Sequence, residues 1–155
     1  MAKAEVIPFL LHDAAEIEPL VRHADRQEIS EALGIPMLEA LQECALGSCK
    51  ASKIVVEGRV VAVFGDAIHS ILGQIGVPWL ISTINVERYP KAFLRVCKPE
   101  VAEMLTRHRE LINFVDIRNT AAIRWLKWLG FDFSQPEPYG PHGHLFHKFT
   151  MTREG

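Results

Sequence analysis

The clearest periodic pattern of apolar and polar residues lies between residues 119 and 131. Four apolar side chains recur at the i, i+3, i+4 and i+7 spacing of one helix face: Ala122, Trp125, Leu126 and Leu129. That spacing is typical of an amphipathic helix of about three turns. Asn119 can cap its first turn, and Gly130 can end it in a left-handed conformation. The pattern therefore predicts a capped helix with one buried face, followed by a strand from Phe131.

The N-terminal third of the chain predicts one strand and three helices. An apolar run over residues 4–11 indicates the strand, and His12 and Asp13 are typical of the helix start that follows it. Gly34 and Pro36 are the stop and start signals between the last two helices. The helices are expected over residues 12–23, 25–33 and 36–46.

The pattern then changes to the period of β structure. Two valine-rich runs, over residues 51–57 and 59–68, meet at Glu57-Gly58 and predict an antiparallel hairpin. A third run over residues 75–84 contains Pro78, which suits an edge strand or a bulge.

The remaining elements alternate between helix and strand. A long helix is expected over residues 89–110, with Pro90 in its first turn and a kink or break at Pro99. Short strands are expected over residues 111–117, 131–133 and 144–152, with residues 134–143 as a loop. This order predicts a single α/β (α+β) domain over residues 1–155, with a mixed, mostly antiparallel, twisted sheet flanked by helices.

Composition narrows the class of protein. The chain has 155 residues, 48% of them hydrophobic and 23% charged, as in an ordinary globular domain. A formal net charge of −2 argues against a generally basic surface for binding nucleic acid. Three cysteines without a secretory signal predict reduced thiols in a protein that is not secreted. The apolar run over residues 6–11 is too short for a membrane anchor.

The sequence gives only weak signals for metal binding and for nucleic-acid binding. The spacing of Cys44 and Cys49 does not match a zinc knuckle, and no metal site is predicted. Lys91, Arg95 and Lys98 share one helix face at the i, i+4 and i+7 positions. This stripe is a solvated basic face, a phosphate-binding surface for coenzyme A, or a weak contact to DNA.

The helix over residues 119–131 also resembles a family signature. Its Asn119, Ala122, Gly130 and Phe131 look like the N-x-x-A…G-F motif in the last helix of the GNAT (Gcn5-related N-acetyltransferase) superfamily. The resemblance implies a GNAT-like acyl-CoA N-acyltransferase fold with acetyl-coenzyme A lying against that helix. It implies these cofactor-binding residues: Arg88, Tyr89, Lys91, Ala92, Asn119, Ala122 and Leu126.

Several positions depart from that family pattern. The tyrosine that usually protonates the departing thiolate is replaced by Leu126, and the turn before the long helix has no glycine over residues 86–93. Pro90 removes an N–H that a phosphate could use. Catalytic residues remain unassigned, with Asp66, Glu87 and Asp116 as general-base candidates by location only.

The family also implies a place for the cofactor. In GNAT folds the acyl-CoA slot is the splay between two strands, here the strand that ends near Thr83 and the strand that begins near Leu111. A slot filled by the side chain of Trp79 or Trp125 would exclude the cofactor.

Other segments resemble the GNAT-like internal virion proteins of short-tailed phages and prophages, over about residues 45–155. They are residues 78–83, 92–95, 115–120, 123–131 and 146–149. This resemblance implies a virion core or assembly protein in the host cytoplasm and the virion, with degenerate or absent acetyltransferase activity and no cofactor. Its partners would be other phage structural proteins or further copies of the chain. The alternative function is an acetyl-CoA-dependent N-acyltransferase of unknown substrate.

Overall fold

The fold is built on one mixed sheet, seen in a computed structural model that describes residues 2–154. The strands pair in the order β1-β2-β3-β4-β5-β8-β6, and β7 also pairs with β8. Every neighbouring pair is antiparallel except β4 and β5, which are parallel. The strands are β1 Ala4–Pro8, β2 Ser48–Val56, β3 Arg59–Ser70, β4 Ile75–Ser82, β5 Glu110–Asp116, β6 Asp132–Phe133, β7 Glu137–Tyr139 and β8 His144–Thr152.

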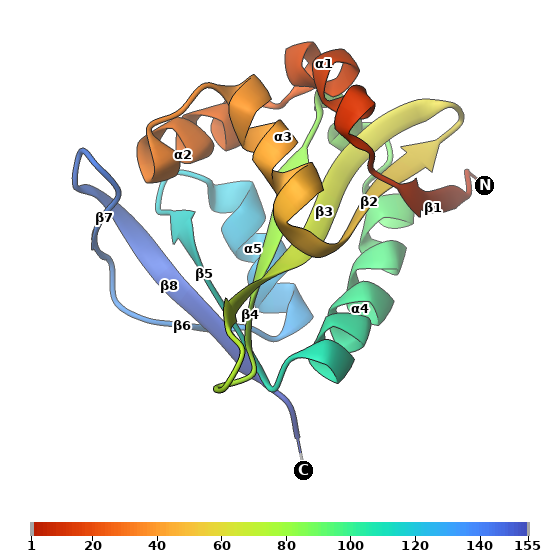
Figure 1. The fold of residues 1–155 in the computed structure, drawn as a ribbon. Coiled ribbons are helices and arrows are strands. Elements are labelled where there is room, and N and C mark those ends of the chain that lie inside the picture. Colours follow the sequence, from red (N-terminus) through yellow and green to blue (C-terminus); the bar gives the residue numbers. More distant parts are fainter. Residues whose placement is uncertain (1, 155) are drawn as a thin grey trace.

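Helices cover both faces of this sheet (Figure 1). The main helices are α1 Ala14–Ile17, α2 His23–Leu33, α3 Met37–Gly47, α4 Pro90–Arg107 and α5 Thr120–Leu129. The first three lie on the front face and the last two on the back. Because it is covered on both sides, β3 has six consecutive buried residues, from Val61 to Asp66, instead of an alternating pattern. No helix of the described residues is long and apolar enough to cross a membrane.

The predicted fold class is confirmed, and so are several of its local signals. The β2–β3 hairpin turns at Glu57 and Gly58, whose φ angles are 50° and 75°. Helix α5 has Asn119 as its N-cap and ends at Gly130, with φ 103°. Helix α2 likewise ends at Gly34, with φ 69°. These positions depend on local backbone conformation, which is why the sequence alone predicts them.

Three expectations are corrected by the structure. The first strand ends at Pro8, since the Asp13 carboxylate accepts the N–H of Leu10 (2.8 Å) and turns the chain there. The helix expected over residues 12–23 is divided into Leu11–Asp13, Ala14–Ile17 and Glu18–Leu20, and Pro19 lies in the last piece. The loop expected over residues 134–143 contains strand β7. A proline is tolerated in β7 because this strand lies at an edge.

The long helix also differs from its expected bounds. Helix α4 is shorter than residues 89–110, and it continues through Pro99 instead of breaking there. Before it, residues Ile84–Glu87 form a short 3-10 helix that the sequence pattern assigned partly to the preceding strand.

The pairing of β4 with β5 is confined to the start of both strands. Only Ile75 with Glu110 and Gly76 with Leu111 are in register, and beyond them the strands diverge (Figure 1). Pro78 lies at this divergence and its carbonyl accepts a hydrogen bond from the Asn113 side chain at 2.7 Å. A proline there has no N–H to leave unpaired in the gap.

Gly76 is required by the ring of His108. A Cβ atom added to Gly76 would fall well inside van der Waals contact of the ring, which Asp66 holds through a 2.7 Å contact at Nε2. We expect Gly76→Ala to lower the free energy of unfolding by about 1–3 kcal/mol through overpacking.

The measurement is urea unfolding of this variant beside Gly47→Ala. A Cβ at Gly47 meets nothing within 4 Å, so this control should leave stability nearly unchanged. Equal stability of the two variants would contradict the assigned role of Gly76.

Candidate functional site

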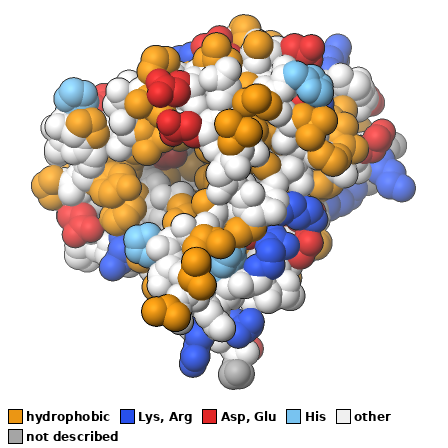
Figure 2. Space-filling model, in the orientation of Figure 1, with side chains coloured by type: hydrophobic (Ala, Val, Ile, Leu, Met, Phe, Trp, Pro, Cys, Tyr) orange, Lys and Arg blue, Asp and Glu red, His pale blue; other side chains and the backbone are white. Residues whose placement is uncertain are grey.

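A cavity of about 400 Å³ occupies the gap between β4 and β5. It is bounded by β4 from Val77 to Ile81, by β5 from Asn113 to Val115, and by side chains of helices from both faces of the sheet. Figure 2 shows a hollow surrounded by hydrophobic side chains on the face that carries α2 and α3. The cavity therefore opens in the slot that the sequence resemblance implies.

Most of the cavity wall is apolar. On the side of α2 and α3 the wall includes Ile29, Leu33, Ala40, Cys44 and Trp79. On the side of α4 and α5 it includes Phe93, Val96, Val101, Met104, Trp125, Leu126 and Leu129. The predicted apolar face of α5 thus lines the cavity, and none of its residues is fully buried. Trp79 and Trp125 form walls of the slot and leave its volume open.

The charged groups of the wall are all acidic. They are Asp25, Glu28, Glu43 and Glu100, and among the described lining residues there is no lysine, arginine or histidine. A wall of this composition favours cationic over anionic ligands.

The open end of the splay is bridged by polar side chains of α2. Asp25 Oδ2 accepts the backbone N–H of Ser82 at 2.5 Å and also the Ser82 hydroxyl. Asp25 Oδ1 accepts from the Asn119 side-chain amide at 3.0 Å. One buried carboxylate therefore joins the end of β4 to the N-cap of α5.

Arg22 crosses the same opening. Its backbone N–H donates to Ser82 O (2.9 Å), and its Nη2 donates to Asp25 Oδ1 and to Asn119 Oδ1, both at 2.8 Å. The guanidinium carbon lies 5.2 Å from the centre of the Trp125 ring, a cation–π contact. The backbone polar groups of Ser82 that face the gap are therefore occupied by α2.

Glu28 also lines the cavity, and it comes from α2. Its Oε1 accepts the backbone N–H of Asp116 at 2.9 Å and the Asn119 amide at 3.3 Å. Within residues 2–154, its Oε2 has no hydrogen-bond donor. Burial raises the pKa of Glu28 to about 8; repulsion from Asp25 and Asp116 adds to this shift, and the hydrogen bonds from Asp116 and Asn119 oppose it. A carboxyl group of this kind can take up or release a proton near neutral pH.

The three general-base candidates from the sequence are not among the residues that line the cavity. Asp66 pairs with Arg107 and His108, and Glu87 lies exposed in the 3-10 helix before α4. Asp116 is buried, which opposes ionisation, but hydrogen bonds from Arg118 keep its pKa below the ordinary value. Sequence analysis did not find Glu28, since an acid on an amphipathic helix is normally a surface charge. Its partners Asp116 and Asn119 lie far along the chain.

The expected cofactor-binding residues fall into two groups. Arg88, Tyr89, Lys91 and Ala92 lie at the start of α4, where no side chain caps the helix. Arg88 and Lys91 are exposed, whereas Ala92 and Tyr89 are buried. The Tyr89 hydroxyl donates to Glu57 (2.7 Å) and accepts from Arg59 (3.2 Å), so it is directed toward the β2–β3 hairpin.

The second group, Asn119, Ala122 and Leu126, lines the cavity. Phe93 of α4 packs edge-on against Trp125 of α5 with ring centres 5.0 Å apart, so the two helices share one wall. The basic stripe remains exposed at Lys91 and Lys98, and the Lys98 ammonium lies 4.3 Å from the centre of the Trp128 ring.

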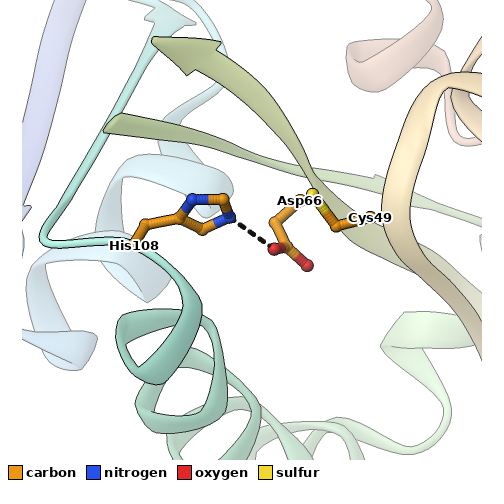
Figure 3. A group of neighbouring side chains, drawn as sticks. All are labelled: Cys49, Asp66 and His108. Carbon is orange, nitrogen blue, oxygen red and sulfur yellow. Dashed lines mark hydrogen bonds and ion pairs between the residues drawn. The ribbon is translucent and has the colours of Figure 1, made fainter. Parts of the chain in front are cut away.

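Cys49, Asp66 and His108 form a separate group whose possible ligand atoms lie within 4.8 Å of one another (Figure 3). Cysteine, aspartate and histidine are all zinc ligands. Here, however, both Asp66 oxygens accept from Arg107, at 2.7 and 2.9 Å, and one also contacts His108. The positive guanidinium occupies the carboxylate that a metal ion would need, so the group fits an ion-pair network better than a metal site.

The cavity thiols are not nucleophiles. Burial raises the pKa of Cys44 and of Cys97 to about 12, with a further contribution from a neighbouring glutamate in each case. Because the thiolate is the reactive form, both side chains act as small apolar parts of the wall.

Comparison with solved structures shows that the chain has the GNAT fold. RimL, a ribosomal alpha-N-protein acetyltransferase, in complex with coenzyme A matches with a TM-score of 0.71 at 9% identity, covering 97% of this chain and 94% of RimL. The aminoglycoside acetyltransferase AAC(6')-Ib with ribostamycin and coenzyme A matches with a TM-score of 0.71 at 16% identity, covering 97% and 94%. A GNAT-family acetyltransferase from Streptococcus pneumoniae matches with a TM-score of 0.66 at 13% identity, covering 98% and 100%.

Sequence comparisons add no closer relation. No protein-family model matches the chain, and no curated protein matches it significantly. The three structures named above are acetyltransferases, so they do not support the resemblance to phage internal virion proteins. That resemblance stays a prediction.

The raised pKa of Glu28 makes stability depend on pH. Between about 4.5 and about 8 the folded protein keeps a proton on Glu28 that the unfolded chain releases. The free energy of unfolding therefore falls as pH rises through this window, by at most about 1.4 kcal/mol per pH unit from this group. Glu28→Gln removes that contribution, so the variant should gain stability relative to the wild type as pH rises.

Urea unfolding at several pH values across the window measures this difference. Glu16→Gln, on the exposed surface of α1, is the matched control and should run parallel to the wild type. A Glu28→Gln curve that also runs parallel would show that Glu28 ionises normally.

Proposed function

We propose that the protein is an N-acyltransferase that uses an acyl thioester of coenzyme A and carries out the transfer in the cavity between β4 and β5. The observation that carries the proposal is the cavity itself. It opens where the two parallel strands part, and Glu28 Oε2 lies at it without a donor. The likeness of the fold to acetyltransferases that bind coenzyme A supports the same assignment.

The walls of the cavity suit the amide-containing arm of such a thioester. In β4, Pro78 and Ser82 direct their carbonyl groups away from β3 and toward the gap. Leu80 lies two residues from both Pro78 and Ser82 in the strand, so its backbone N–H and C=O also point toward the cavity. An extended ligand could pair with this one peptide group, while the apolar walls exclude water.

The start of α4 suits the phosphate end. The helix has 18 residues and no side-chain cap, so the N–H groups of Lys91 and Ala92 are available at the positive end of its dipole. Arg88 and Lys91 add positive charge there, and they offset the repulsion from Glu87 and the donor lost at Pro90.

The chain supplies a proton acceptor for the transfer. Acyl-coenzyme A would bring an activated thioester carbonyl to the cavity. Glu28 Oε2 accepts a proton from the amine as its nitrogen forms the new amide bond and the carbon–sulfur bond breaks. Glu28 then holds this proton with a pKa of about 8, close to the ordinary thiol value of about 8.5, so the same group can return it to the departing sulfur. One residue would thus replace the tyrosine that is absent at Leu126.

Arg22 limits access to this site. Its guanidinium spans the opening between Ser82 and Asn119, so a ligand that enters from that end must displace it from Asn119. Arg22 keeps Asp25 as a partner in that case, which lowers the cost of the displacement.

Acetyl-CoA binding tests the proposal directly. Calorimetric titration of the full chain should give measurable heat, and Ala122→Trp should weaken binding by about tenfold or more because its ring would fill the cavity wall. Arg124→Trp, on the exposed face of the same helix, is the control and should bind normally. Absence of heat at millimolar ligand would rule the proposal out.

The phosphate end has its own test. Lys91→Glu should weaken acetyl-CoA binding by about three- to tenfold while leaving acetyl-pantetheine binding unchanged, because only the first ligand carries phosphates. Equal losses for the two ligands would show that Lys91 does not contact phosphate.

A non-catalytic binding protein of the same fold is the second candidate, favoured by Leu126. In that case no thiol is released from acetyl-CoA with any amine, and binding of acetyl-CoA is not required. A role in virion assembly belongs to this candidate and predicts head and tail genes beside the coding sequence.

A further inference from the structure

We infer that the cavity binds an amphipathic primary amine, a cationic head on an alkyl or aryl body, as the acyl acceptor. The inference rests on the proposed function only for the transfer step, since the amine can bind without a thioester. It follows from three properties of the cavity: the sign of its charges, the chemistry of its walls and the unsatisfied oxygen of Glu28.

The charges of the wall select a cation. Arg22 is the basic group nearest to the opening, and Asp25 pairs with it at 2.8 Å, so these two charges cancel. Three carboxyl groups, Glu28, Glu43 and Glu100, remain along the wall. A carboxylate or phosphate ligand would find no basic side chain among the described residues of the wall, whereas an ammonium group would find carboxyl oxygens as acceptors.

Glu28 provides the specific contact. It is enclosed by protein between α2, β5 and α5, and its Oε1 already accepts two hydrogen bonds. Its Oε2 has no protein donor within residues 2–154, and it is not a buried atom, so it is open to a ligand in the cavity. An ammonium N–H satisfies that atom and neutralises its charge at the same time.

The walls select the body of the molecule. Aliphatic and aromatic side chains line the cavity both on the side of α2 and α3 and on the side of α4 and α5. They include Ile29, Leu33, Trp79, Phe93 and Leu129. An alkyl or aryl body would replace water against these surfaces with a favourable free energy. A polyhydroxylated amine would place hydroxyl groups against apolar walls with few partners, which disfavours it.

The test compares matched ligands on the full chain. Calorimetry should show that hexylamine binds at least about tenfold more tightly than hexan-1-ol or hexanoate, which share its chain but not its charge. Affinity should rise by about fourfold for each methylene added from butylamine to octylamine, as apolar burial predicts. Glucosamine should bind more weakly than hexylamine.

Two variants assign the contact. Glu28→Gln, which is nearly isosteric, should remove most of the preference for hexylamine over hexan-1-ol and leave hexan-1-ol binding unchanged. Glu16→Gln on α1 should leave both affinities unchanged. Retention of hexan-1-ol binding also shows that the Glu28 variant is folded.

Each contrary result is decisive. Equal affinities for the amine and the alcohol, tighter binding of hexanoate, or an affinity independent of chain length would overturn the inference. If acetyl-CoA fails to bind but hexylamine binds as described, the proposed function is wrong and the amine site stands. If acetyl transfer proceeds to glucosamine and hexylamine does not bind, the function stands and this inference is wrong.

Discussion

The carboxylate of Asp25 is the contact on which the arrangement of the two halves of the molecule depends. It is buried at 3% exposure and accepts hydrogen bonds from Arg22, from the Ser82 backbone and hydroxyl, and from Asn119. These partners belong to the start of α2, the end of β4 and the cap of α5. Removing one partner of such a buried, paired charge typically costs several kcal/mol, about 3–5. Side chains thus hold the open end of the splay between β4 and β5, at the opposite end from the short backbone ladder.

The same arrangement explains why an amphipathic helix lacks a fully buried face. Ala122, Trp125, Leu126 and Leu129 have the spacing of core residues and pack against the core, but part of their surface faces a cavity of about 400 Å³. An unfilled apolar volume costs stability relative to a packed core. The Glu28 side chain lines the same volume, so the cavity combines apolar walls with a carboxyl group.

Much of the fold could be predicted from the sequence because its signals are local. Asn119 and Gly130 mark the ends of α5, and Glu57-Gly58 marks a hairpin, through the conformations of the residues themselves. Strand β7 was missed because the prolines in and around it indicate a loop, and only its pairing with β8 makes it a strand. The fold class follows from the order of these elements, so it survives errors in single boundaries.

The site was less predictable because its chemistry depends on residues distant in sequence. Glu28 is an ordinary helix acid until the Asp116 N–H and the Asn119 amide enclose it and shift its pKa. Arg22 and Asp25 belong to no sequence motif that would mark them as site residues. The expected cofactor-binding residues that do line the cavity, Asn119, Ala122 and Leu126, all belong to the helix that carries the local signature.

The brief pairing of β4 with β5 also has a mechanical consequence. Two residue pairs form the whole β ladder between the leaf formed by β1 to β4 and the leaf formed by β5 to β8. With so short a ladder, the stiffness of this joint depends strongly on the side chains that cross it. Occupancy of the gap would then control how cooperatively the two leaves unfold, so that a bound molecule would serve as a structural tie as well as a substrate.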